Sequence, residues 1–478
     1  MTIKKMIFIA YLLLLFWQPV NAQSDSSYTL QQCVDIAFKN NNDVKQADLS
    51  AENARINYLQ SKANKLPTLS AGISHSLYNG RSINPYTNSY IDEQNFTGSY
   101  SLGTSIILWN GSSLQNYMRQ YALSYEAGKM DAQNVKDNLT INIILNYLTV
   151  LSTQEQLSIA QRQVESSKEK VEILNKKNND GAIPPPDLYD MKGQLATDEI
   201  NVVNTKNTLE IAKLKLAQLM NIPYSPNMKF ASISDADVLP EPYDATVDEI
   251  YGNASKRLAL IKSGELKMAS AEKNIQAIKG AMLPSLYFSG NLYTNYSNTA
   301  NTMQYINTTD VQTSNYVLVN NVKTPVYEPQ SNYNSIPISY GSQLKNNLYS
   351  GLSIGLQIPI SNNLQYRNKL KQARIAEQQA TVQNENNKVQ LKQAIEQDYL
   401  NLTASYETYK KYLLQMGDFK QSFHAADVKF KAGATLNIVD FIIAKNNLDR
   451  AELNIVSAKY DYILRRKLLD FYQNRLLW

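Results

Sequence analysis

The sequence predicts a duplicated, mostly helical protein with a small β part. Three observations lead to this fold class. Matching residues recur in the same order in the two halves of the chain, two runs of about 69 residues show helical patterning without proline, and four short segments alternate apolar with polar residues. The long helices are expected to pack in a coiled-coil-like manner, because helices of that length are not stable alone.

The duplication is visible in the spacing of the matching residues. Residues 66–69 read Leu-Pro-Thr-Leu, and residues 283–286 read Leu-Pro-Ser-Leu 217 positions later. Farther along, Tyr147 matches Tyr399 at a spacing of 252, and beyond Gly433 the spacing becomes 253. A period this long is not a solenoid repeat, so the chain consists of two pseudo-equivalent halves. The change from 217 to 252 means that the second half gained 35 residues between its Leu-Pro and its next helix.

The longest helices are predicted over 112–180 and 363–432. Each run contains a single glycine and no proline, and its apolar residues recur at steps of three and four. As α-helices these runs reach roughly 100 Å at 1.5 Å per residue. Shorter helical patterns cover 28–66, 187–220, 246–282 and 438–475.

Four short strands are predicted between the helices, in two pairs. They are 69–78 with 98–108 in the first half and 286–296 with 348–358 in the second. The segments inside each pair, 79–97 and 297–347, are rich in Asn, Tyr, Ser and Thr and are expected to be polar loops. Four strands cannot close a barrel in lipid, because two edges keep unpaired backbone groups. The chain is therefore expected to oligomerise.

The alternation is cleanest in the last strand. Leu352, Ile354 and Leu356 share one parity with other apolar residues, while Ser353 and Gln357 fall on the other. A membrane-spanning β-strand needs this pattern over about ten residues, so the three apolar side chains are expected to face lipid. A half-buried strand of a soluble sheet shows the same alternation and is the alternative.

The chain begins with the features of an export signal. Two lysines precede an apolar run over 6–17, and Ala22 supplies a small residue at a cleavage site, so 1–22 is predicted to be a signal peptide. An N-terminal anchor helix is the alternative, although a dozen apolar residues is short for a membrane span. The rest of the chain is divided into a first structural repeat over 23–222, a proline-containing linker over 223–245 and a second repeat over 246–478.

Composition and motifs exclude several function classes. The formal charge of +5 is small for 478 residues and no Lys/Arg cluster is present, which argues against nucleic acid as a partner. Cys33 is the only cysteine, so no intramolecular disulfide is possible. His75 and His424 lie in no metal-binding motif, and the chain has no glycine-rich phosphate loop and no Gly-x-Ser-x-Gly. We therefore expect no catalytic residues, no cofactor and no metal site, and hence no enzyme.

The combined pattern resembles the TolC-like outer-membrane efflux proteins, the outer-membrane factors. The resemblance rests on the signal peptide, the duplicated halves, the Leu-Pro before a strand, and the strand-end turns 108–111 (Leu-Trp-Asn-Gly) and 359–362 (Pro-Ile-Ser-Asn). It implies a homotrimer in which four strands per chain form a twelve-stranded barrel in outer-membrane lipid. It also implies that the helices form a tunnel in the periplasm, an α-barrel that docks to a periplasmic adaptor (membrane fusion) protein and an inner-membrane transporter.

The resemblance also implies a role for the turns between the long and the returning helices. These turns contain Gly181 and Gly433, and the acidic residues just beyond them, Asp187 and Asp440, are the candidates for the periplasmic aperture and the adaptor contact. The first turn departs from the family pattern because it contains the run Pro184–Pro186. A helix N-terminal carboxylate, favoured by the helix dipole, is the alternative for each Asp.

The function that follows from this resemblance is a passive one. The chain is expected to be the outer-membrane exit duct of a tripartite efflux pump or of a type I secretion system. The alternative is a periplasmic adaptor or another structural coiled-coil protein of a transport complex. Two helical hairpins with two alternating strand pairs argue against an adaptor, and a secreted enzyme lacks a convergent set of polar groups.

Overall fold

The computed structural model describes residues 27–83, 88–92, 94–233, 241–432 and 438–475. The predicted signal peptide 1–22 and Gly433 lie outside the described residues. The chain forms two compact units. The first comprises Met1–Arg55, Leu123–Met268 and Gln378–Trp478, and the second comprises Ile56–Ala122 and Ala269–Glu377. Each unit therefore takes residues from both sequence repeats.

Helices dominate the described chain, as the sequence predicts. Their bounds are α2 Leu30–Asn40, α3 Asn42–Ala63, α4 Ser113–Asn179, α5 Pro185–Met220, α6 Val247–Arg257, α7 Ala259–Ala281, α8 Tyr340–Asn346, α9 Gln365–Lys431 and α10 Ile438–Gln473. The two longest, α4 and α9, have 67 residues each. Among the described residues, no helix combines the length and the apolar character needed to span a membrane.

Two helices expected to be continuous are broken, so this part of the prediction is wrong. The segment 28–66 divides at Asn41 and the segment 246–282 divides at Leu258, both with extended backbone. The Asn41 side chain explains its own break, because its oxygen accepts from the Asp43 amide at 2.8 Å and its nitrogen donates to the Leu219 carbonyl at 3.1 Å. Such local side-chain bonds compete with helix continuation.

The two breaks belong to the duplication. Asn41 and Leu258 are 217 residues apart, the spacing of the Leu-Pro motifs. The short helices before them both begin with a capping box, formed by Thr29 with Gln32 and by Thr246 with Glu249. The first two Thr residues are again 217 apart, so the repeated unit includes the helix break.

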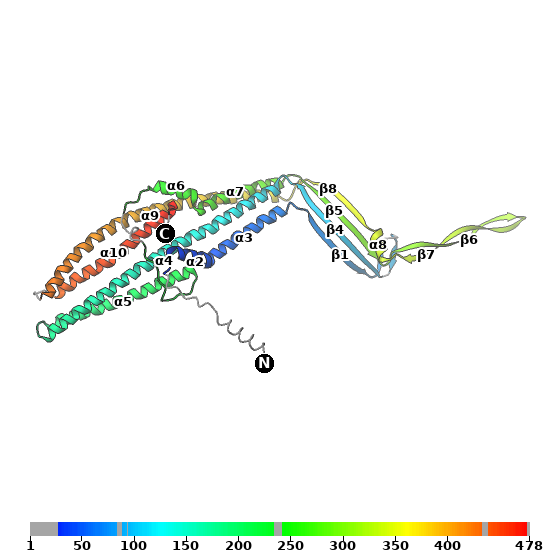
Figure 1. Cartoon of the computed structure of the whole chain (residues 1–478). Helices are drawn as coiled ribbons and strands as arrows, with labels where there is room; N and C mark the ends of the chain where they lie inside the picture. The colour runs from blue at the N-terminus through cyan, green and yellow to red at the C-terminus, as the bar shows by residue number, and fades with distance from the viewer. Residues whose placement is uncertain (1–26, 84–87, 93, 234–240, 433–437, 476–478) are drawn as a thin grey trace, which may run out of the picture. The chain divides into compact units, whose positions relative to one another are not determined.

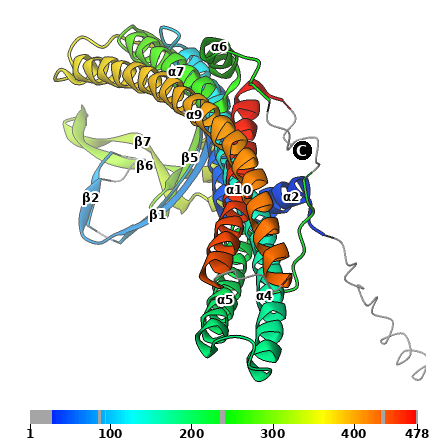
Figure 2. The ribbon, with the colours of Figure 1, turned by 90° about the vertical axis from the view of Figure 1, so that its left-hand side faces the viewer.

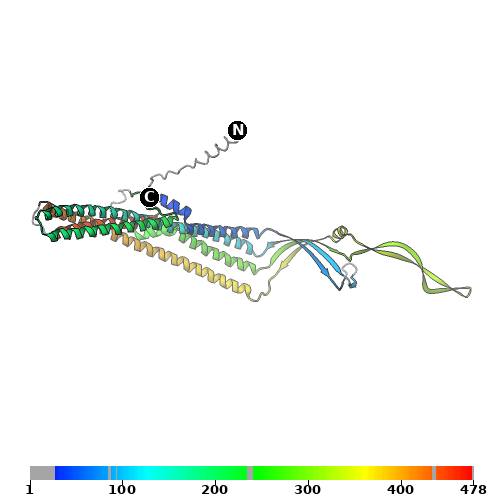
Figure 3. The ribbon, with the colours of Figure 1, turned by 90° about the horizontal axis from the view of Figure 1, so that it is seen from below.

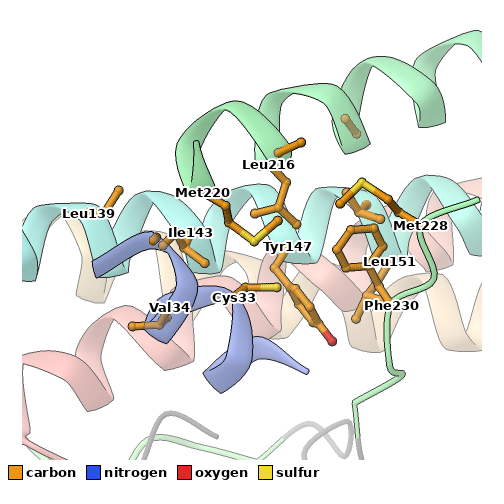
Figure 4. Close-up of a cluster of buried hydrophobic side chains, with 14 of the residues drawn as sticks. Cys33, Val34, Leu139, Ile143, Tyr147, Leu151, Leu216, Met220, Met228 and Phe230 are labelled. Carbon is orange, nitrogen blue, oxygen red and sulfur yellow. The ribbon is translucent and has the colours of Figure 1, made fainter. Parts of the chain in front are cut away.

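The first unit is held by apolar clusters between helices. One cluster joins α2, α4, α5 and the segment 228–230 (Figure 4). The Tyr147 ring lies inside it, and its hydroxyl lies 3.0 Å from the Tyr28 carbonyl oxygen and 2.7 Å from that of Ala231. Cys33 is fully buried there, and burial raises the pKa of its thiol to about 12. The single cysteine is thus a small apolar contact.

The second unit contains a four-stranded antiparallel sheet in the order β1-β4-β5-β8 (Figure 1). The strands are β1 Thr68–Tyr78, β4 Asn95–Trp109, β5 Ser285–Ser297 and β8 Tyr349–Gln357. Their register repeats the sequence spacing. Thr68 pairs with Ser105 in the first half, and Ser285 pairs with Gln357 in the second, which are shifts of 217 and 252 residues. The two strand pairs are therefore structural copies of one another.

The expected polar loops contain further strands, which corrects the prediction for 79–97 and 297–347. The first holds the short strands β2 Arg81–Ile83 and β3 Tyr90–Asp92. The second holds α8 and a long hairpin of β6 Asn301–Val319 and β7 Val322–Pro337 (Figure 3). The reversal uses Asn320 and Asn321, whose φ values of 54° and 63° are those that a two-residue hairpin turn needs. The 35 extra residues of the second half thus lie in a segment that is largely a hairpin.

Candidate functional site: a two-faced sheet and the ends of the helical hairpins

One face of the four-stranded sheet is apolar across all four strands. Residues that lie opposite each other in an antiparallel sheet share a face, and the register aligns the apolar parities of neighbouring strands. We call this the apolar face: Leu69, Ala71, Ile73, Leu77, Phe96, Tyr100, Leu102, Ile106, Leu286, Phe288, Leu292, Leu352, Ile354 and Leu356. The candidate residues Leu352 and Ile354 are 80% and 70% exposed in the single chain.

The opposite face carries small polar side chains. We call it the polar face: Ser70, Ser74, Ser99, Ser101, Ser105, Ser289, Asn291, Asn295, Ser353 and Gln357. Hydroxyls meet across the strands on this face, with 2.7 Å between the Oγ atoms of Ser289 and Ser353. A sheet of a soluble protein buries its apolar face and exposes its polar face to water. Here the apolar face is exposed, so a surface of this kind calls for a partner.

The sheet also has two open edges. Within the described residues, β1 and β8 each pair with one neighbour only, β4 and β5 respectively. Each edge strand therefore presents a row of free backbone N–H and C=O groups on its outer side. An uncovered edge of this length is a template for another strand.

The turn after α4 has the geometry that its glycine predicts. Gly181 adopts a φ of +68°, and its amide donates to the Asn178 carbonyl at 3.0 Å. The amide of Ala182 donates to the Lys177 carbonyl at 2.8 Å, which completes a Schellman motif. The following helix α5 begins at Pro185, two residues earlier than predicted, because proline is tolerated in a first turn where its missing N–H has no helical partner.

Asp187 and Asp440 occupy the same place in the two returning helices. Each is the third residue of its helix, α5 or α10, and is the acidic residue of the first turn. The helix dipole favours a carboxylate at this position, which satisfies the alternative reading of these residues as well as the aperture reading. Asp440 is exposed and Asp187 is half-buried.

The structure brings the ends of the two hairpins together (Figure 2). Leu188 and Met191 of the first hairpin pack with Phe430 and Phe441 of the second, whose rings stack at 4.8 Å. Beside them the buried Lys170 of α4 forms an ion pair of 2.7 Å with Asp427 of α9. The residues that flank both turns therefore lie in one place.

A buried charge network that the sequence reasoning missed lies farther along the same helices. Lys445 of α10 contacts two carboxylates, Asp198 of α5 at 2.8 Å and Asp449 of its own helix at 2.5 Å. Asp198 also accepts hydrogen bonds from Ser167 of α4 and from Gln194, the latter at 2.8 Å. One sequence signal pointed to part of it, the Lys-Asp pair at i and i+4 in α10, whereas the cross-helix partners follow only from the packing.

The network has an electrostatic signature at Asp449. Burial raises the pKa of this carboxyl to about 6, and the nearby Lys445 ammonium opposes the rise. Lys445 and Asp198 are buried in the helical interface. Removing one partner from such a site leaves a buried charge without compensation, so the network constrains how α4, α5 and α10 fit together.

The pH dependence of stability is expected to report this carboxyl. Because the folded chain holds a proton on Asp449 that the unfolded chain has lost, its contribution is present below about pH 4 and disappears as pH rises through about 6. Relative to Asp449→Asn, the parent should lose up to about 3 kcal/mol over this range. The measurement is thermal unfolding of the detergent-solubilised protein at pH steps. Asp461→Asn, an exposed Asp on α10, is the control, and parallel pH curves for parent and Asp449→Asn contradict the assignment.

The comparisons with known proteins agree with this architecture. A family model described as "Outer membrane efflux protein" matches residues 33–221. The chain is 23% identical over 426 residues to the outer membrane protein TolC of Escherichia coli, covering 88% of this chain and 76% of TolC. It is also 23% identical over 269 residues to the pyoverdine export outer membrane protein OpmQ of Pseudomonas putida, covering 55% of each.

Solved structures extend the likeness to nearly the whole chain. CusC, described as forming a transmembrane channel, superposes with a TM-score of 0.72 at 16% identity, covering 96% of this chain and 95% of its own. The outer membrane protein VceC of Vibrio cholerae superposes with a TM-score of 0.70 at 13% identity, covering 93% and 94%. These relatives are channel and export proteins by name. The predicted resemblance to the TolC-like outer-membrane efflux proteins is therefore confirmed, by sequence over most of the first repeat and by fold over nearly all of the chain.

Proposed function

We propose that this protein is the outer-membrane exit duct of a tripartite efflux pump or type I secretion system. It works as a passive homotrimeric conduit that docks to a periplasmic adaptor and an inner-membrane transporter. The observation that carries the proposal is the exposed apolar face on a sheet with two open edges. The names of TolC and OpmQ, an outer membrane protein and an export protein, support the location and the direction of transport.

The two faces of the sheet suit the two environments of a membrane channel. The apolar face lies against lipid and the polar face lines a water-filled lumen. The strands contain 11, 15, 13 and 9 residues, and a tilted strand needs about 9–11 residues to cross the hydrocarbon core. In lipid an open edge leaves backbone groups unsatisfied at several kcal/mol each, so the edges of β1 and β8 must be covered by strands.

A second copy of the chain supplies the covering strand. Neighbouring strands of the sheet are all antiparallel, so placing β1 of the next copy beside β8 continues the alternation. Three copies give twelve strands, the number that the family resemblance implies. The lumen, the lipid face and the trimer thus follow from one arrangement.

The duplication supports a specific register for the seam between copies. In the seam within the chain, between β4 and β5, Ser101 pairs with Tyr293. The repeat spacings of 252 and 217 carry these positions to Ser353 on β8 and Ser76 on β1. If the seam between copies copies the seam within the chain, Ser353 lies opposite Ser76 of the next subunit, and Leu356 lies opposite Ile73. This register also keeps apolar residues beside apolar residues.

At the other functional end, the turns containing Gly181 and Gly433 form the periplasmic tip of the trimer. Asp187 and Asp440 are repeated three times around the opening and hold it closed through contacts between subunits. Docking of the adaptor at these turns opens the tunnel. The packing of the two hairpin ends against each other supports a shared tip.

The membrane assignment is tested by a matched pair of arginine substitutions in β8. Ile354→Arg places a charge on the apolar face and should cost about 2–4 kcal/mol at mid-membrane depth. The neighbouring Ser353→Arg points to the lumen, so it should assemble normally and change ion permeation. Assembly is measured by outer-membrane fractionation and detergent-resistant oligomers. Equal tolerance of the two substitutions refutes the assignment of the faces.

The seam is tested by paired cysteines in a Cys33→Ala background. Ser353→Cys with Ser76→Cys should form disulfides between subunits, because opposite residues in a ladder lie within the distance that a disulfide spans. The product is expected to be a ladder on a non-reducing gel that ends at three chains. Ser353→Cys with Ser74→Cys is the control, displaced by two residues. Stronger linkage of the control pair, or a ladder ending elsewhere, overturns the register or the trimer.

The aperture is tested by replacing both acidic residues. Asp187→Ala with Asp440→Ala should raise single-channel conductance in planar bilayers by loosening the closed state, with thermal stability of the trimer nearly unchanged. Glu199→Ala with Asp461→Ala removes the same charge farther along the same helices and serves as the control. If the double variant conducts like the parent, the two carboxylates act only at the helix N-termini.

A further inference from the structure

The β6–β7 hairpin is the largest departure from the duplicated plan. It leaves the sheet after β5 and returns through α8 to β8, so within the second unit it lies at the end of the strands opposite the helices (Figures 1 and 3). Most of its side chains are exposed. A two-stranded hairpin in water is at best marginally stable by itself. Some of its exposed surface is therefore expected to find a partner.

The middle of the hairpin needs only water. Asn332 donates from its side-chain nitrogen to Asn307 at 3.0 Å and to Thr309 at 2.8 Å, and the surrounding residues are Thr, Ser and Gln. These side chains satisfy one another or the solvent. The middle section therefore gives no reason for a partner.

The tip differs from the middle, and its two faces differ from each other. The register pairs Val317 with Thr324 and Val319 with Val322, so these four residues share one face, which we call the valine face. The three valines are 52%, 53% and 66% exposed, and the face carries no charge.

The opposite face of the tip is marked by a lysine. Leu318 pairs with Lys323 and Tyr316 with Pro325 on this face. The Lys323 ammonium lies 4.3 Å from the centre of the Tyr316 ring, an arrangement that keeps the charge at the surface. Burying this side would desolvate the ammonium, whereas burying the valine face desolvates only apolar groups and one hydroxyl.

We propose that the valine faces of three copies bury one another, so that the hairpins form a threefold collar beyond the outer end of the sheet. The inference rests on the proposed trimer, since subunits joined through β1 and β8 carry their hairpins at the same level. A strand of 19 residues reaches about 60 Å, long enough to bring the tips together. The absence of charge on the valine face avoids repulsion between identical copies.

The size of the patch fits an intramolecular contact within an assembled trimer. Four small residues bury far less than the roughly 1,000 Å² that a free pair of proteins needs for stable association. Subunits already held in one ring meet at an effective concentration in the millimolar range, so a small contact suffices. The tips thus associate only after the barrel has formed.

Two single cysteines at the same height distinguish the two faces of the tip. In a Cys33→Ala background, Val319→Cys should form disulfide-linked dimers within the membrane-embedded trimer under mild oxidation. One disulfide uses two of the three subunits, so the expected product is dimer with remaining monomer. Leu318→Cys, on the lysine face, is the matched control and should stay largely unlinked and open to a water-soluble maleimide.

The outcomes separate this inference from the proposed function. Equal linkage at Val319→Cys and Leu318→Cys, or linkage at neither, overturns the collar. If the Ser353–Ser76 pair still links three chains in that case, the trimeric duct stands and another molecule or solvent meets the valine face. If that pair also fails, the trimer and the collar fall together.

Discussion

The unpaired backbone groups along β1 and β8 are the constraint on which the rest of the architecture depends. A four-stranded sheet with an exposed apolar face can satisfy its edge hydrogen bonds in lipid only through strands of further copies. The duplication gives these copies a matching geometry, because the register of β1 with β4 recurs in β5 with β8 at the repeat spacing. Closure, face assignment and subunit number are therefore one physical problem with one solution.

Charge burial plays the corresponding part among the helices. Lys445 compensates Asp198 and Asp449 at the meeting of α5 and α10, and Lys170 compensates Asp427 between α4 and α9. Buried ion pairs contribute little net stability compared with apolar packing, but a misplaced partner is costly. Such pairs therefore select one relative position of helices whose apolar stripes alone would allow sliding by a turn.

The predictable part of this fold is the part encoded by periodicity. The long helices and the four strands follow from proline-free helical patterning and from alternation, and both are strong local signals. The helix breaks at Asn41 and Leu258 were missed, since each depends on one extended residue within an otherwise helical pattern. The β6–β7 hairpin was taken for a loop because its polar Asn and Thr residues hide the alternation, and its Asn-Asn turn is a weak signal without a register. The Asp198–Lys445 contact joins residues 247 apart, and no local pattern specifies it.

The differences between the two halves are informative because their common features are accounted for by closure. Both halves share the capping box, the helix break and the strand register, and all of these lie in segments that pack against the chain's own elements. The halves differ in the proline run at 184–186, in the extra residue after Gly433 and in the hairpin of the second half. A duplicated chain in a threefold assembly offers six equivalent positions around its axis, and a feature present in one half only reduces them to three. The hairpin therefore supplies three tips rather than six, and a threefold contact of its uncharged faces is what that number permits.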